Sequence, residues 1–423
     1  MEPNAMERDA LYQDVYEKYM NFINPNLAKL MGFGGFGVEM RAEGCYIYDH
    51  EGRQFLDCLG GYGTFSFGHR HPRIIDAVKR QLDIMPLSGK AFFGQNAANL
   101  AAKLAELTPG DLKVSFFCNS GTEAVEACLK LAKGATGRVK IVSTEGSYHG
   151  KTLGALAATG RAKYRKKFEP LMPGVEFVPY GDVEALVNAV DDQTACVILE
   201  PIQGEGGLIV PPDGYLRAAR EACDKHGALL IFDEVQTGMG RTGYRFGCNH
   251  DGVAPDLMSL AKAIGGGVMP LGVAVYTEDV YNKVFGENPL AHTSTFGGNP
   301  LACAAGLEAL AVLEEEGLAE RSRILGERML AGFRKIQAKF PELLADVRGR
   351  GLMIGAEFSM DEVGEVVVAT LMKHGVCVAY TLNNPRVLRF EPPLTVSEEQ
   401  IEKALAAFED GLLETQSLLA LLV

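Results

Sequence analysis

The middle of the chain alternates short apolar runs with segments whose apolar positions recur at helical spacing. A short apolar run bounded by turn residues is typical of a buried strand, and a repeat of about 3.6 residues is typical of an amphipathic helix. Strands are expected at 114–117, 141–143, 196–200, 229–232, 257–260 and 273–276, and helices near 122–133, 214–225 and 300–316. This order predicts a mostly parallel sheet with helices on both faces.

Both ends of the chain follow other patterns. After about residue 317, helices of mixed charge at 318–340, 361–374 and 397–414 surround strands at 351–358, 376–380 and 387–390. Near the start, apolar residues from Tyr12 to Phe22 recur at helical spacing, and alternation around a turn predicts a hairpin at 45–57. We expect a large domain, 61–316, and a small α+β domain, 317–423, which the N-terminal segment, 1–60, joins.

Composition and charge narrow the class of protein. The chain has 423 residues, of which 47% are hydrophobic and 22% are charged, and its formal net charge is -13. A single core usually stops growing near ~250–300 residues, so more than one domain is expected. The acidic balance and the lack of a long Lys/Arg block argue against a nucleic-acid partner, because phosphate binding needs a basic face.

The cysteines and the first residues bear on location. The nine cysteines are an odd number without a Cys-x-x-Cys pair, which is typical of reduced packing residues in a cytoplasmic protein. Residues 1–9 lack the basic and apolar regions of a signal peptide, and no run approaches the roughly 18 apolar residues of a membrane span. We therefore expect a cytoplasmic protein with no membrane partner and no metal.

One acid and one lysine stand at the ends of two successive apolar strands. Asp233 ends the strand at 229–232, and Lys262 follows the strand at 257–260. Pyridoxal phosphate needs both groups, because a lysine holds its aldehyde covalently and a carboxylate keeps its ring nitrogen protonated. An arbitrary Asp and Lys would more often be a salt-bridge acid and a solvated surface lysine. The neighbouring motifs favour the cofactor site.

The segment 118–124 lies between an expected strand and an expected helix, and it contains Ser120, Gly121 and Thr122. Free backbone N–H groups and the positive end of the helix dipole bind anions, and the two hydroxyls can add hydrogen bonds. A phosphate is the natural ligand for such a turn. Ordinary helix capping by Ser and Thr explains the same residues, so this motif does not decide alone.

Four further polar side chains are expected near the same sheet edge or in a second apolar segment. Tyr148 follows the strand at 141–143 and can stack on a pyridine ring. Glu205 lies in a glycine-rich loop, where the backbone can approach a ligand closely. Gln236 follows soon after Asp233 and can donate a hydrogen bond to the phenolic oxygen of the ring. Arg389 stands in an apolar segment and needs a partner, and its fork suits a carboxylate.

These motifs together resemble the class III aminotransferases, the ω-aminotransferase group of the fold-type I pyridoxal-phosphate enzymes, from about residue 47 to about residue 394. The motifs that carry the resemblance are Ser120-Gly121-Thr122, Tyr148-His149-Gly150, Asp233-Glu234-Val235-Gln236-Thr237-Gly238, Lys262 and Thr295-Phe296-Gly297-Gly298-Asn299-Pro300. The implied fold is an α/β large domain with a mostly parallel sheet of the seven-stranded type, covered by helices, and a smaller α+β domain.

The resemblance also implies roles for individual residues. Lys262 would hold the cofactor, Asp233 would pair with its pyridine nitrogen, and Gln236 would contact its ring hydroxyl. Gly121 and Thr122 would bind its phosphate.

A contribution from a second subunit is implied as well. Enzymes of this family are dimers with sites at the interface, and Thr295 would reach the phosphate held by the neighbouring subunit. A homodimer or a dimer of dimers is therefore expected.

Within the family, the chain is most similar to the putrescine aminotransferases, in segments 59–63, 68–70, 115–123, 265–270, 381–384 and 389–394. The implied reaction moves a terminal amine of putrescine or cadaverine to a 2-oxo acid, with 2-oxoglutarate as the expected acceptor, and gives an aminoaldehyde and glutamate. Glu205 is implied to pair with Arg389 while the amine is bound and to release it for the carboxylate of the oxo acid.

Other functions share much of this pattern. An ornithine, acetylornithine or lysine ω-aminotransferase has the same cofactor residues and differs in whether the donor carries an α-carboxylate. An internal amino shift needs no 2-oxo acid. A pyridoxal-phosphate-binding regulator would carry an appended DNA-binding module and a degraded Lys/Asp pair, and the sequence has neither feature.

Overall fold

A seven-stranded sheet forms the centre of the part of the chain that the structure describes. The structure is a computed structural model, and it describes residues 4–421. The strand order is β4-β10-β9-β8-β7-β5-β6. The bounds are β4 (Leu112–Cys118), β5 (Lys140–Thr144), β6 (Val175–Val178), β7 (Thr194–Leu199), β8 (Leu229–Asp233), β9 (Leu257–Leu260) and β10 (Gly272–Thr277). Strands β5 to β9 are parallel, and β10 is antiparallel to β4 and β9.

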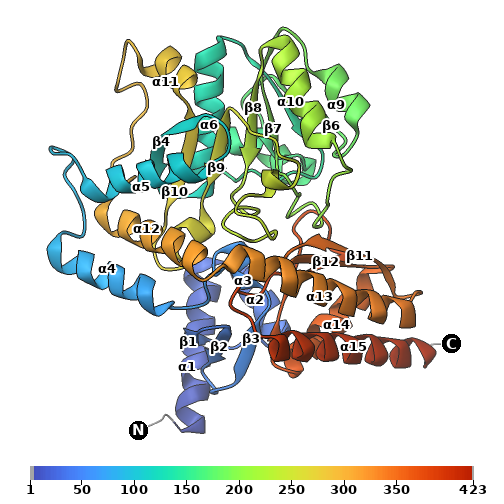
Figure 1. Cartoon of the computed structure of the whole chain (residues 1–423). Coiled ribbons are helices and arrows are strands. Elements are labelled where there is room, and N and C mark those ends of the chain that lie inside the picture. The colour runs from blue at the N-terminus through green and yellow to red at the C-terminus, as the bar shows by residue number, and fades with distance from the viewer. Residues whose placement is uncertain (1–3, 422–423) are drawn as a thin grey trace.

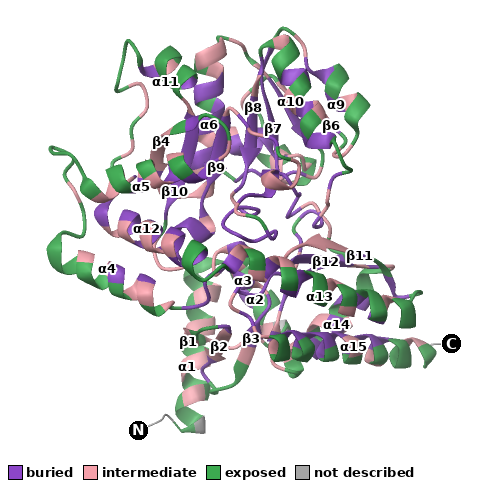
Figure 2. Ribbon diagram, viewed as in Figure 1, coloured by how far each residue is buried: buried purple, intermediate pink, exposed green. Residues whose placement is uncertain are grey.

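Helices cover both faces of this sheet (Figure 1). Ile231 of β8 packs in one core with Val125 of α6 (Gly121–Thr136), whereas Leu230 and Phe232 pack in the other core with Tyr215 of α10 (Tyr215–His226). Successive side chains of a strand point to opposite faces, so a strand between two helix layers is apolar throughout. Figure 2 shows β7, β8 and β9 as buried strands. The prediction of a mostly parallel, two-sided sheet is confirmed.

The remaining helices around the large sheet include both short and long elements. They are α4 (Pro72–Ile84), α5 (Gln95–Leu107), α7 (Leu153–Ala158), α8 (Ala162–Arg165), η2 (Lys166–Phe168), α9 (Val183–Ala189), η3 (Gly247–His250), η4 (Lys262–Gly265), α11 (Glu278–Phe285) and α12 (Pro300–Glu315). Asn299 caps α12 by accepting the N–H of Ala302 at 2.9 Å, and Pro300 opens the helix. Proline suits that position because its missing N–H would be unpaired there anyway.

Residues 4–421 also form two four-stranded sheets, which lie with the C-terminal helices on the other side of the molecule from the large sheet (Figure 1). One has the order β1-β2-β3-β13 and the other β11-β12-β15-β14. Their bounds are β1 (Glu39–Glu43), β2 (Tyr46–Asp49), β3 (Gln54–Asp57), β11 (Leu344–Arg350), β12 (Met353–Phe358), β13 (Val376–Cys377), β14 (Ala379–Tyr380) and β15 (Val387–Phe390). The long helices there are α13 (Leu318–Lys339), α14 (Asp361–Lys373) and α15 (Glu398–Ala420).

The N-terminal segment meets the C-terminal part of the chain through one strand pair. Leu56 of β3 pairs with Val376 of β13 in parallel orientation. The hairpin expected at 45–57 is present as β2 and β3. The domain boundaries at residues 60 and 316 stay a prediction.

The first helices differ from the prediction for residues 12–22. Helix α1 (Ala5–Lys18) continues into a π-helical turn, η1 (Tyr19–Ile23), before α2 (Pro25–Phe33) begins. A π-helical turn takes up an extra residue, which rotates the following side chains out of the apolar stripe. The side chain of Phe22 is 82% exposed as a result. The helix expected over these residues is present, and Phe22 lies outside its half-buried face.

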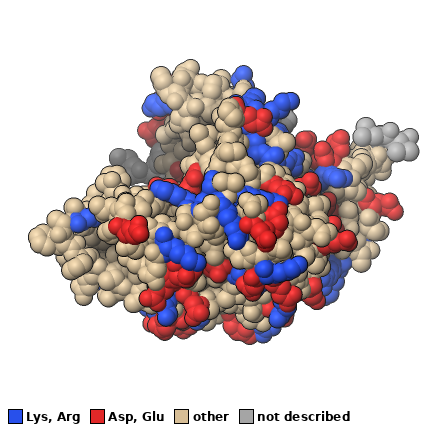
Figure 3. Space-filling model, turned by 90° about the horizontal axis from the view of Figure 1, so that it is seen from above, with Lys and Arg blue, Asp and Glu red and all other residues tan. Residues whose placement is uncertain are grey.

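Two observations concern the surface. Within residues 4–421, none of the helices is both long enough and apolar enough to cross a bilayer. On the face seen in Figure 3, basic and acidic side chains are interspersed. Among the exposed ion pairs, Arg328 of α13 pairs with Glu398 and Glu402 of α15. Exposed pairs of this kind contribute about 0–1 kcal/mol each to stability, so they steer helix packing only weakly.

Candidate active site

A cavity of about 600 Å³ opens at the carboxyl ends of the parallel strands. Its lining residues follow five strands and include Ser120, Gly121 and Thr122 after β4, Tyr148 and His149 after β5, Glu200 after β7, Asp233 and Gln236 at the end of β8, and Lys262 after β9. In open α/β sheets, ligands bind in the crevice at this edge. The cavity thus brings together seven of the ten predicted site residues.

The N-terminus of α6 faces the cavity. Ser120 caps this helix, since its Oγ accepts the N–H of Glu123 at 3.3 Å and donates to the Glu123 carboxylate at 3.1 Å. Oγ1 of Thr122 lies 2.7 Å from Oγ1 of Thr152. Both hydroxyls already have partners, so the groups most available to an anion are the first N–H groups of the helix, beginning at Gly121. The capping explanation holds for Ser120, and the helix terminus still offers an anion site.

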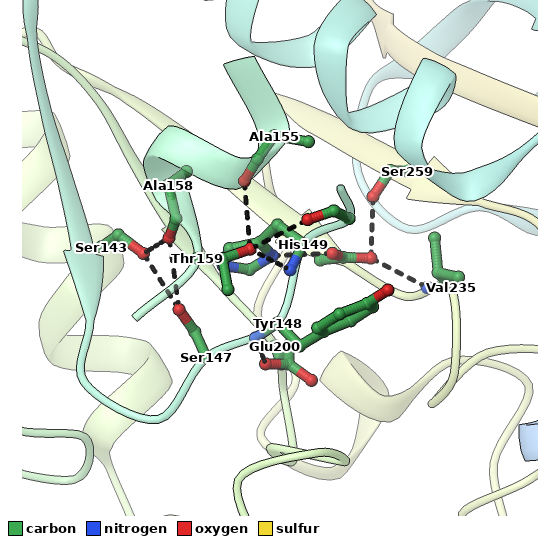
Figure 4. A network of polar contacts seen from close by, with 12 residues as sticks. Ser143, Ser147, Tyr148, His149, Ala155, Ala158, Thr159, Glu200, Val235 and Ser259 are labelled. Carbon is green, nitrogen blue, oxygen red and sulfur yellow. Dashed lines mark hydrogen bonds and ion pairs between the residues drawn. The ribbon is translucent and has the colours of Figure 1, made fainter. Parts of the chain in front are cut away.

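Asp233 is held at the end of β8 by donors from three segments. Figure 4 labels the donors His149, Val235 and Ser259. Oδ2 of Asp233 lies 2.7 Å from Nδ1 of His149, and its Oδ1 accepts the hydroxyl of Ser259 at 3.0 Å and the N–H of Val235 at 3.2 Å. His149 is fixed in turn, because its backbone N–H donates to Oγ1 of Thr159 at 3.1 Å. Asp233 therefore presents a rigidly oriented carboxylate to the cavity.

Glu200 is a second buried acid beside this network, and sequence reasoning missed it. Its Oε1 accepts the N–H of Tyr148 and its Oε2 accepts the N–H of Gly204, both at 3.0 Å. Burial raises the pKa of the Glu200 carboxyl to about 7, while His149 opposes the rise and Asp233 adds to it. The available signal was its position, since Glu200, like Asp233, comes at the end of an apolar strand.

Lys262 begins the 3₁₀ helix η4 with a backbone φ of 51°. This left-handed conformation costs a residue with a Cβ atom roughly 1–2 kcal/mol. Residues strained in this way cluster at functional sites. Burial lowers the pKa of the Lys262 ammonium, and the carboxylates of Glu391 and Glu205 oppose that shift. Lys262 therefore loses its proton more readily than a lysine on the surface does.

Arg389 and Glu205 form a buried ion pair. Nη2 of Arg389 lies 2.5 Å from Oε2 of Glu205, and Nη1 lies 3.9 Å from Oε2 of Glu391. The guanidinium carbon is 5.0 Å from the centre of the Tyr62 ring. Burial opposes the charge of Arg389, but Glu205 and Glu391 outweigh burial, and the pKa of Arg389 is raised. The predicted need of Arg389 for a carboxylate partner is confirmed.

Thr295 lies apart from these residues in the chain that the structure describes. It is exposed, in the segment between α11 and α12. Its neighbours Thr293 and Ser294 line a second hollow together with Phe92 and Phe93. The side chain of Phe92 is 90% exposed, and that of Phe93 is fully exposed. A single copy of the chain does not bring Thr295 into the cavity.

Three residues of the site lay inside recognised motifs but had no predicted role: Tyr62, His149 and Glu391. Tyr62 has a φ of 59° within the turn α3 (Gly60–Gly63), where the neighbouring glycines share the left-handed conformation. The run Gly60-Gly61-Tyr62-Gly63 was the signal for that turn. His149 follows a predicted contact residue directly. The contacts of Glu391 depend on how segments far apart in the chain pack together, and the sequence pattern does not specify this packing.

Comparison with known proteins agrees with this geometry. The model of the family described as aminotransferase class III matches residues 36–412. The ornithine aminotransferase of Toxoplasma gondii ME49 is 33% identical to the chain, with a TM-score of 0.88 over 98% of this chain and 99% of that one. A second structure of that enzyme, 32% identical with a TM-score of 0.89 over 99% of each chain, is described with pyridoxal phosphate at its active site.

A bacterial enzyme is similar to the same extent. The (S)-enantioselective ω-transaminase of Thermomicrobium roseum is 30% identical, with a TM-score of 0.89 over 97% of this chain and 99% of that one.

The raised pKa of Glu200 leads to a prediction about stability. A carboxyl whose pKa is raised on folding stabilises the protein fully below its unfolded pKa, and this stabilisation is lost as the pH rises through the folded pKa. The Glu200→Gln variant should therefore become more stable relative to the wild type by about 2–3 kcal/mol between pH 4.5 and pH 8. Denaturant unfolding across this pH range measures the difference.

The exposed Glu145, on the loop after β5, provides the control. Glu145→Gln should have a profile parallel to that of the wild type. Parallel profiles for Glu200→Gln and the wild type would show that Glu200 is not protonated on folding.

Proposed function

The chain belongs to the class III aminotransferase family, and we propose that it moves a terminal amino group from a diamine to a 2-oxo acid. Enzymes of this family use pyridoxal phosphate. The predicted fold class, that of the fold-type I pyridoxal-phosphate transferases, is confirmed by the central sheet and by these relatives. The proposed donor is putrescine or cadaverine and the proposed acceptor is 2-oxoglutarate, so that the products are an aminoaldehyde and glutamate.

The residues of the cavity fit this cofactor. The cavity offers a half-buried lysine with a lowered pKa, a buried carboxylate and a helix N-terminus within about 600 Å³. These are the groups that an aldehyde, a pyridinium and a phosphate require. We assign the aldehyde to Lys262, the ring nitrogen to Asp233, the ring oxygen to Gln236, and the phosphate to Gly121 and Thr122 with the cap Ser120. Tyr148 is assigned to the ring face.

Bound pyridoxal phosphate supplies a protonated ring that withdraws electrons from the substrate carbon. In the proposed mechanism, Lys262 moves the proton. Its Nζ accepts a proton from the carbon that carries the amine, because burial favours the neutral form of this lysine. Asp233, fixed by His149 and Ser259, keeps the ring nitrogen charged while this happens. The buried surroundings exclude water, which strengthens both interactions.

The observation that carries the choice of donor is the buried pair between Arg389 and Glu205. The guanidinium of Arg389, which suits a substrate carboxylate, is already neutralised by Glu205, and Glu391 supplies a second carboxylate 3.9 Å away. We therefore favour a diamine, which has no carboxylate that requires this cation, over a donor with an α-carboxylate. For the oxo acid we propose that Glu205 moves aside, since a buried arginine left without a partner is strongly unfavourable.

A second candidate function is the ω-transamination of ornithine, acetylornithine or lysine. The similarity to an ornithine aminotransferase over nearly the whole chain favours it. This function uses the same cofactor residues and differs only in the donor.

A half-reaction distinguishes the two functions. Holoenzyme mixed with putrescine alone should convert from the aldehyde form of the cofactor to the amine form about 10-fold or more faster than with ornithine, lysine or 4-aminobutyrate, because the arginine that suits a carboxylate is already paired with Glu205. Stopped-flow absorbance of the cofactor measures the rates. Faster conversion with ornithine would assign the enzyme to the amino-acid ω-aminotransferases.

The two halves of the reaction should respond differently to Arg389→Ala. The 2-oxoglutarate half-reaction should lose about 100-fold or more in kcat/KM, because the variant lacks the cation that pairs with the acceptor carboxylate. The putrescine half-reaction should lose about 10-fold or less. Arg386→Ala, at an exposed arginine three residues away, is the control and should leave both halves unchanged. Equal losses in both halves would contradict the role of Arg389.

We also propose a homodimer, or a dimer of dimers, in which Thr295 contacts the cofactor phosphate of the neighbouring subunit. The neighbouring exposed side chains of Phe92 and Phe93 support this proposal, because monomeric proteins seldom expose such a pair beside a hollow. The double variant Phe92→Ser, Phe93→Ser should shift sedimentation towards the monomer and weaken cofactor retention. Ile324→Ser, at another exposed apolar residue, should leave the assembly unchanged. A dimer that persists in the double variant would place the interface elsewhere.

A further inference from the structure

Glu391 is a fully buried carboxylate whose position is fixed by its own backbone. Its N–H donates to the carbonyl of Cys58 at 2.7 Å. Its carbonyl oxygen approaches Gly60 so closely that a Cβ atom there would be 2.1 Å away. The Glu391 side chain is 0% exposed. The segment after β15 is therefore clamped against the turn α3, and the carboxylate has little freedom to move.

Both oxygens of this carboxylate accept from one atom. Nε2 of Gln236 donates to Oε1 of Glu391 at 2.8 Å and to Oε2 at 3.0 Å. Two oxygens of one carboxylate subtend a narrow angle at the nitrogen, so they share one hydrogen of the amide. The second hydrogen on Nε2 is left for another acceptor.

The carboxylate determines which way the amide faces. An ionised carboxylate only accepts hydrogen bonds, so it takes the nitrogen of Gln236 and not its oxygen. The amide oxygen then lies on the side of Gly204, where a Cβ atom would be 1.9 Å from Oε1 of Gln236. Glu391 and Gly204 thus hold the amide from two sides. Gln236 itself lines the cavity, next to Lys262.

Basic side chains surround the Glu391 carboxylate. The guanidinium of Arg389 is 3.9 Å away, and Glu391 is the largest of the charges that oppose the lowered pKa values of Lys262 and Arg241. Glu391 also contributes to the raised pKa of the Tyr62 hydroxyl, which burial raises most. The carboxylate of Glu391 therefore interacts electrostatically with three basic groups, Arg389, Arg241 and Lys262.

We infer that Glu391 is a positioning residue that orients the Gln236 amide, so that its free N–H points to the ring oxygen of the cofactor. The inference rests on the proposed function, which assigns Gln236 to that oxygen. Glu391 acts through Gln236 and does not touch the cofactor itself. A glutamine at position 391 can either donate or accept, so it no longer imposes one orientation on Gln236.

The test compares two cofactors in Glu391→Gln and Gln236→Ala. The probes are pyridoxal 5'-phosphate and its 3-deoxy analogue, which lacks the ring hydroxyl. Equilibrium dialysis starting from holoenzyme gives the dissociation constant of each. Both variants should bind pyridoxal phosphate about 3–10-fold more weakly, which is the effect of one lost hydrogen bond. Both should bind the 3-deoxy analogue with unchanged affinity. The double variant should bind pyridoxal phosphate no more weakly than Gln236→Ala alone.

Glu234→Gln is the matched control. Glu234 is also buried and accepts the N–H groups of Gly247 and Cys248, both at 2.8 Å. Its loss should lower the melting temperature but keep the ratio of the two dissociation constants. If Glu391→Gln does not fold, Glu391→Asp replaces it, because aspartate only accepts hydrogen bonds but reaches less far.

Two results would overturn the inference. One is an unchanged ratio of dissociation constants in the folded Glu391 variants. The other is an additive loss in the double variant, which would mean that Glu391 acts independently of Gln236. If the wild-type enzyme binds the cofactor and reacts with putrescine, the proposed function stands even when this inference fails. If the wild-type enzyme does neither, the proposed function itself is wrong.

Discussion

Burying titratable groups at the edge of a sheet requires a partner for each, and the organisation of this molecule follows from that constraint. Glu200, Glu205, Asp233, Arg389 and Glu391 are all at most 5% exposed. An unpaired ion in such surroundings costs several kcal/mol, which is comparable to a large part of the stability of a whole domain. Each of these groups therefore has donors or acceptors on another segment, and the site is a network before any ligand binds.

The partners come from both sides of the molecule. Glu205 follows β7 of the large sheet, and Arg389 lies 184 residues further on in β15. Oε2 of Glu205 also accepts the N–H of Leu382 at 2.7 Å, and the amide of Asn383 donates to the carbonyl of Gly146 at 2.7 Å. The turn between β14 and β15 is thus joined to two loops of the large sheet. The same polar groups that form the site also fix one sheet against the other.

The sequence predicted the part of the site that local rules determine. Asp233 and Lys262 were found because parallel strands end at one edge, so side chains just after those strands converge. The pair between Arg389 and Glu205 followed only from a resemblance, since no periodicity relates two residues so far apart. The orientation of Gln236 by Glu391 was out of reach for the same reason.

The fold shows the same division between local and distant determinants. The start of α12 at Asn299 and Pro300 was predicted because a cap residue and a proline specify it within a few positions. Strand β11 was missed because its two buried side chains, Leu344 and Val347, do not alternate with polar ones, so its pairing with β12 determines it more than its own pattern does. The widened turn at Phe22 changed the phase of a helix that otherwise follows its prediction.

The parallel pairing of Leu56 with Val376 bears on the order in which the chain can mature during synthesis. Strand β3 leaves the ribosome early, whereas its partner strand β13 is followed only by β14, β15 and α15 among the described residues. Until then the first sheet carries an open edge, which is the kind of surface that chaperones bind and that associates with other chains. A polypeptide released too soon has the lysine and the acid of the cavity but lacks the arginine. Such a product has both an unpaired strand edge and an incomplete site, so the sheet and the site are completed by the same last part of the chain.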